Sequence, residues 1–124
     1  MEMVKTLISG TFFDTNYDQL IAIFKKVLKN EEKIRLKHRV VGEEINYEDD
    51  LHEIYIFSLN NHKSPKIDDY NINSEYKDNV KNATIFLEEL ASVFQAENIK
   101  YEFEYNEVIG GVEGEEYELQ HPDL

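Results

Sequence analysis

The chain has 124 residues, the length of a single domain, and 41% of them are hydrophobic, which is enough for a buried core. It contains no cysteine, so disulfides, thiolate metal sites and cysteine nucleophiles are excluded. The formal net charge of −13 opposes binding to nucleic acid and to anionic membranes, and it attracts basic partners. We therefore expect one folded domain, residues 1–124, that binds neither nucleic acid nor membrane.

Residues 3–13 are predicted to form a first strand, because apolar side chains recur at alternating positions. Gly10 within this strand indicates a bulge or the close approach of another backbone. Residues 14–16 supply capping side chains for a helix that is expected to run to about Asn30. The apolar stripe of this helix has helical spacing and consists of Leu20, Ile23, Phe24, Val27 and Leu28.

The rest of the chain is organised around residues 33–59, which are predicted to form two paired strands. Apolar and basic residues alternate from Lys33 onward, a pattern typical of a strand with one buried face. Gly42 is interpreted as a bulge that lets this strand continue to Tyr47. The next strand ends near Leu59 and is apolar on both faces at residues 54–57, as a central strand would be.

The second half begins with residues 60–73, which are polar, contain Pro65 and are predicted to form a long loop. A second helix is expected to begin near Ser74 or Asp78. Residues 100–106 alternate tyrosine and phenylalanine with charged residues and are predicted to be a strand. Glycines at 110 and 111 indicate a turn, and residues 116–120 are consistent with a short extra strand.

This order of elements, β-α-β-β-α-β with an extra C-terminal strand, predicts an α+β fold of the ferredoxin-like type. An antiparallel sheet would carry two helices on one face and leave the other face open. The first and third strands would be central, with the second and fourth at the edges.

The alternation also predicts which side chains line the open face. Arg35, Lys37 and Arg39 are expected at one margin, Glu102 and Glu104 at the other, and Tyr55 and Phe57 in an apolar stripe between them. Large exposed apolar patches usually mark interfaces, so a homodimer through this face is one interpretation. In the alternatives, residues 112–124 fold over the face, or the parity assigned to the third strand is wrong.

Motifs for chemistry are weak. Residues 69–73 resemble the opening of a calcium loop, but Ser74 and Val80 stand where glycine and a bidentate glutamate are required. The four histidines lack metal-ligand spacing, and no phosphate loop or dinucleotide fingerprint occurs. We predict no catalytic residue, metal site or cofactor.

The function that we expect is that of a small acidic, non-enzymatic protein acting through association. Its acidic surfaces, including the turn at Glu48, Asp49 and Asp50, would bind a basic protein, as an inhibitor or immunity-type protein does. The alternative is a regulatory domain that binds a small molecule at the sheet or a dimer interface. Its pocket would be lined by Tyr55, Phe57, Tyr101 and Tyr105. With no secretion signal or long apolar run at its start, the chain is expected to be cytoplasmic.

Overall fold

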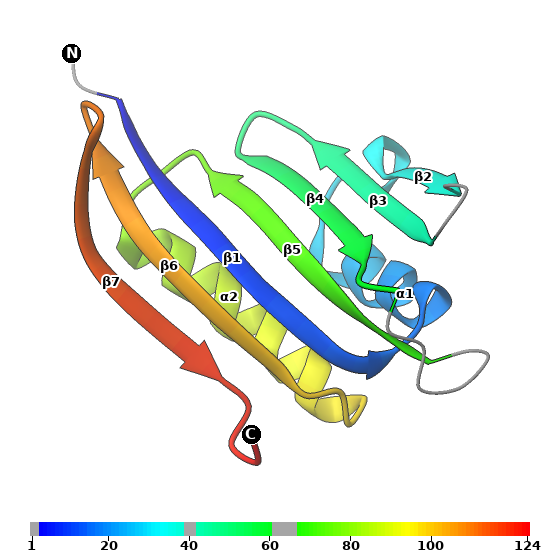
Figure 1. Cartoon of the computed structure of the whole chain (residues 1–124). Coiled ribbons are helices and arrows are strands. Elements are labelled where there is room, and N and C mark those ends of the chain that lie inside the picture. Colours follow the sequence, from blue (N-terminus) through cyan, green and yellow to red (C-terminus); the bar gives the residue numbers. More distant parts are fainter. Residues whose placement is uncertain (1–2, 39–41, 61–66) are drawn as a thin grey trace.

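The computed structural model describes residues 3–38, 42–60 and 67–124, in which a seven-stranded antiparallel sheet carries two α-helices (Figure 1). The strand order is β2-β3-β4-β5-β1-β6-β7. Both helices lie on the same face, behind the sheet in the view of Figure 1. The elements are β1 (Val4–Thr15), α1 (Tyr17–Val27), a 3-10 turn (Glu31–Lys33), β2 (Arg35–His38), β3 (Glu43–Glu48), β4 (His52–Ser58), β5 (Asp68–Tyr76), α2 (Val80–Ala96), β6 (Tyr101–Ile109) and β7 (Val112–Gln120).

The α+β class is confirmed, but the predicted ferredoxin-like order is not matched, because the sheet has seven strands. The first error concerns residues 33–47, where Arg35–His38 and Glu43–Glu48 form two paired strands, β2 and β3, instead of one bulged strand. Gly42 precedes β3 with a φ of +88°, a backbone conformation that favours glycine. Of the predicted basic margin, Arg39 lies outside the described residues.

The second error concerns β5, whose residues were expected to be loop and helix start. This strand lies between β4 and β1, the central position that had been assigned to β4. Its buried side chains, Tyr70, Ile72 and Tyr76, alternate with polar ones that were interpreted as loop residues. Residues 61–66, within the predicted loop, lie outside the described part of the chain.

The long strand β1 holds the sheet together by pairing with β5 on one side and β6 on the other. The backbone and a side chain of β6 lie close to Gly10. A Cβ atom built on Gly10 would lie 2.3 Å from the carbonyl oxygen of Glu102, so a larger residue would force the strands apart. The close approach that the sequence suggested is therefore the reason for glycine here.

The core lies between the sheet and the helices and is centred on Phe12 of β1, which is fully buried. The ring of Phe12 stacks on Phe94 of α2, with centroids 4.5 Å apart, and meets the edge of Phe24 of α1 at 6.0 Å. Phe103 of β6 completes the cluster at 5.8 Å. One side chain thus links both helices to the sheet.

The helices begin at well-defined caps. The side chain of Asn16 accepts a hydrogen bond from the backbone N–H of Gln19, and Asn79 does the same for Asn82. A carboxylate oxygen of Glu107, on β6, accepts the N–H of Val80 at 2.9 Å, which ties the start of α2 to the sheet. Neither helix of the described part has the length and apolar character that crossing a bilayer requires.

The C-terminal residues form β7, which pairs with β6 along the edge of the sheet and does not cover the open face (Figure 1). The pairing shifts register between Asn106 and Val108, where residues 114 and 115 of β7 lie opposite the single residue Glu107. This is a β-bulge, and it contains Gly114.

Among the buried polar residues, one carries an aromatic ring that packs against rings of the core. His52, at the start of β4, is 7% exposed, and its ring centroid lies 4.5 Å from that of Phe86 and 5.0 Å from that of Tyr76. The buried Nδ1 atom has no hydrogen-bond partner among the described residues. Burial lowers the pKa of His52 below its ordinary value of 6.5, against an opposing effect of the Asp49 carboxylate.

We expect the protein to lose stability as the pH falls below about 6.5, because His52 protonates more readily in the unfolded chain than in the core. The unfolded state binds more protons in this window, so the free energy of unfolding decreases toward acid pH. The contribution of one histidine is at most about 1.4 kcal/mol per pH unit. A His52→Phe variant keeps an aromatic ring at this place and should lack this contribution. Urea denaturation of both proteins across the pH range measures the difference, and parallel stability curves would contradict the assignment.

Candidate functional site

The face of the sheet opposite the helices is the candidate site. Pairing between the strands aligns its side chains in three rows that cross the sheet, and we call these rows the open face. The first row is Glu48, Glu53, Glu75, Leu7, Asn106 and Glu116. The second row is Arg35, Asn46, Tyr55, Asn73, Ser9, Glu104 and Glu118, and the third is Lys37, Glu44, Phe57, Asn71, Thr11, Glu102 and Gln120.

The charges of the open face are distributed as the sequence predicted at its two margins. Arg35 and Lys37 of β2 lie at one margin, and Glu102 and Glu104 of β6 lie near the other. The outermost strand there is β7 rather than β6, so the acidic margin is wider than expected and extends through Glu116 and Glu118.

The apolar stripe expected between the margins is largely absent. Within the three rows it is represented by Leu7, Tyr55 and Phe57, because the unforeseen strand β5 places Asn71 and Asn73 in the middle of the face. Thr11 donates a hydrogen bond to Asn71 at 2.9 Å, which continues the polar surface onto β1.

The middle of the open face is hollowed into a groove of about 500 Å³. Its floor is formed by Leu7 and Ser9 of β1 and Asn73 of β5, and its walls carry four glutamates. The wall residues are Glu53, Tyr55, Glu75, Glu104, Asn106 and Glu116. The one ion pair at this groove joins Lys5 and Glu75 at 3.2 Å, as far as the described residues show. The groove is therefore a depression surrounded by glutamates.

The aromatic pair of the open face has a defined position. The ring of Tyr55 stacks on that of Phe57 at 5.1 Å, and the Tyr55 hydroxyl donates to a carboxylate oxygen of Glu44 at 2.7 Å. Tyr101 and Tyr105, which were expected to share a pocket with this pair, point to the opposite face. They are buried under α2, where Tyr101 bonds Gln95 and Tyr105 bonds Thr84.

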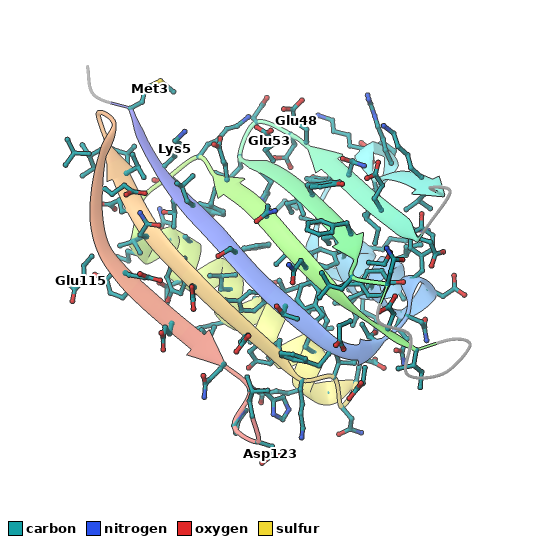
Figure 2. All side chains as sticks on the ribbon, in the orientation of Figure 1. Met3, Lys5, Glu48, Glu53, Glu115 and Asp123 are labelled. Atoms are coloured by element: carbon teal, nitrogen blue, oxygen red, sulfur yellow. The ribbon has the colours of Figure 1, made fainter. Side chains whose placement is uncertain are left out.

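The three predicted acidic residues of the β3–β4 turn differ in role. Glu48 belongs to the open face, where it lies beside Glu53 (Figure 2). Asp49 holds the turn, because its carboxylate accepts hydrogen bonds from the Tyr47 hydroxyl and the backbone N–H groups of Leu51 and His52. Burial raises the pKa of Asp49, but these hydrogen bonds outweigh it and hold the pKa below its ordinary value. Asp50 is exposed in the turn itself.

The acidic margin is a place of like-charge crowding. Glu104 lies directly opposite Glu118 on the neighbouring strand, with Glu116 and Glu102 nearby. The charge of Glu116 is the main cause that raises the pKa of Glu104 above its ordinary value of 4.5, followed by burial and the charge of Glu118. Like charges directly opposite each other destabilise a sheet, so this arrangement costs folding stability.

Several residues of this face were not identified from the sequence. Glu53, Glu75, Glu116 and Glu118 complete the acidic surface. Their alternation with Ile54, Tyr76, Tyr117 and Leu119 is the signal that could have placed them.

No group of three or more histidine, aspartate or glutamate side chains in the described ranges is arranged to hold a metal ion. The calcium-like motif at residues 69–73 forms part of β5, an extended strand that cannot wrap a cation as a loop does.

We expect a Glu104→Gln variant to be more thermally stable than the wild type at about pH 7, because it removes one charge from the crowded margin. A raised carboxyl pKa means that the folded state loses stability as the pH rises through that pKa. The increase in melting temperature of the variant over the wild type should therefore be smaller in acid, where Glu104 is protonated, and in high salt, which screens the charges. Calorimetry at low and high salt checks this, with Glu88→Gln on α2 as control. Equal melting temperatures of wild type and variant at low salt would contradict it.

Comparisons of this chain with protein-family models, with curated proteins and with solved structures find no match. The shape and charge of the open face are therefore the basis for inferring a function.

Proposed function

We propose that this chain is a non-enzymatic protein that acts by binding a basic protein on the open face of its sheet. The observation that carries the proposal is the acidic groove on a face that no described helix or strand covers. Such a surface suits an inhibitor or immunity-type protein, which masks a basic partner and needs no chemistry of its own.

The charge distribution supports a basic partner. On the three rows of the open face, glutamates greatly outnumber the two basic residues, Arg35 and Lys37, and these lie at one margin. The whole chain carries the same sign, with a net charge of −13. Complementary potentials speed the encounter of two proteins and fix their orientation.

The shape of the face supports a partner that is convex. The groove lies over β1 and β5, and its further lining residues come from β4 on one side and from β6 and β7 on the other. A helix or loop that projects from a basic protein can enter this depression and place its charges near Glu53, Glu75 and Glu104. All rows of the open face are carried by paired strands, which position side chains more precisely than loops do.

The homodimer expected from the sequence remains a prediction. In a two-fold symmetric dimer, Arg35 and Lys37 of one copy would lie against the glutamates at the opposite margin of the second copy. Face-to-face packing would, however, set one groove against the other and leave both unfilled. We therefore propose a different protein, and not a second copy, as the main occupant.

The experiment compares two double variants. Glu104→Gln with Glu116→Gln removes two charges from the groove, and Glu88→Gln with Glu89→Gln removes two exposed charges from α2. A basic protein captured from a native lysate at low salt should bind wild type and the α2 variant equally. We expect the groove variant to bind about two- to fivefold more weakly for each charge removed. If the wild type, the groove variant and the α2 variant bind the basic protein equally, the partner binds outside the groove and the proposal is contradicted.

A second candidate is binding of a small cationic molecule in the same groove. The volume of about 500 Å³ is the specific observation that favours it, because ligand pockets usually span about 300–1,000 Å³. Under this reading spermine should raise the melting temperature of the wild type but not of the groove variant. A ligand at a hundred times its dissociation constant stabilises a protein by about 2.7 kcal/mol, which a thermal-shift assay detects. An unchanged melting temperature in spermine would exclude this candidate.

A further inference from the structure

At the outer edge of the sheet, β7 has no further strand beside it in the described part of the chain. β7 is nine residues long and pairs only with β6 among the described strands. His121, which follows β7, donates its backbone N–H to the carbonyl oxygen of Tyr101, and hydrogen-bonded pairs alternate along an antiparallel ladder. The backbone N–H and C=O groups of Glu116, Glu118 and Gln120 are therefore directed away from β6, toward the free edge.

The side chains along this edge are acidic on one face. Glu116 and Glu118 project on the open face, next to Glu102 and Glu104 of β6, and Glu115 projects outward from the bulge (Figure 2). No lysine or arginine occurs after Lys100 in the sequence. The crowding of these glutamates destabilises the sheet in the absence of a partner, and a cationic partner would relieve it.

The other face of β7 offers apolar contacts. Tyr117 is 40% exposed, and its ring stacks on that of Tyr105 of β6 at 5.6 Å. Leu119 is half-buried against the core. An added strand would therefore find glutamates on one side and a tyrosine ring on the other, which suits a segment that alternates basic and apolar residues.

A second copy of the chain does not fit this edge. In an antiparallel pair of two β7 strands the glutamates of one copy would face those of the other. Charged side chains on an edge strand are a common device against such self-association. The acidic edge thus selects a partner of opposite charge.

We propose that an extended lysine- or arginine-rich segment of the partner adds to β7 as an eighth strand, with its basic side chains over Glu116 and Glu118. This inference rests on the proposed function and specifies how the basic partner docks.

The test uses a nine-residue peptide of alternating lysine and valine, matched in length to β7. Amide hydrogen exchange of the full chain is followed by NMR with and without the peptide. We expect the amides of Glu116, Glu118 and Gln120 to become protected from exchange by about tenfold or more, since they gain hydrogen bonds. Protection of these amides without added peptide, growing with protein concentration, would show self-pairing and overturn the proposal.

Two variants at one position separate backbone pairing from charge. Gln120→Pro removes an outward N–H without changing the charge, and an edge strand tolerates proline there. Gln120→Val retains the N–H and serves as the matched control. We expect the proline variant to bind the peptide several-fold more weakly and the valine variant to bind it like wild type.

The outcomes distinguish this inference from the proposed function. If the peptide binds with shifts at Glu53, Tyr55 and Glu75 but without protection of β7, docking occurs in the groove and the eighth-strand proposal is wrong while the proposed function stands. If the peptide does not bind, the eighth-strand proposal is overturned. The proposed function is then tested separately, by comparing how strongly the groove variant and the α2 variant bind a basic protein.

Discussion

The packing of Phe12 is the interaction on which the rest of the structure depends. This side chain comes from β1, next to the central strand β5, and contacts an aromatic ring from each helix and one from β6. Because both helices are anchored to the same cluster, both must lie on the same side of the sheet. That constraint leaves the opposite side uncovered by any described helix or strand, and the seven strands present a broad surface there.

The like charges on that surface lower the folding stability of the protein. A row that sets Glu48, Glu53 and Glu75 on neighbouring strands, and a margin that sets Glu104 opposite Glu118, both place like charges where a sheet prefers opposite ones. Natural proteins keep such unfavourable arrangements mainly where function requires them. The sheet rather than the helices is the candidate for binding, because this crowded surface also contains the groove.

The sequence predicted the α+β class and several elements but not the strand order, and these failures have physical causes. The first strand, both helices and the strand at Tyr101 were recognisable because their apolar residues follow a regular period. The strand β5 was missed because aspartate and asparagine at alternate positions resemble a loop, whereas pairing on both sides stabilises them in a strand. The margins of the open face followed from alternation alone. The groove could not be predicted in this way, because it exists only when β5 lies beside β1 and β7 lies beside β6.

The bulge in β7 illustrates a constraint on every strand of the sheet, which must supply both core residues and outward-facing residues. Residues that build the core and residues that face outward follow one another along the chain, so a single inserted or deleted residue exchanges their roles until another irregularity restores the phase. At residues 114 and 115 the chain contains such an irregularity, and the phase is reset before Glu116. Over evolutionary time, point substitutions can therefore retune the outward residues without disturbing folding, whereas small indels within a strand are expected to be tolerated only where a bulge or a turn absorbs them.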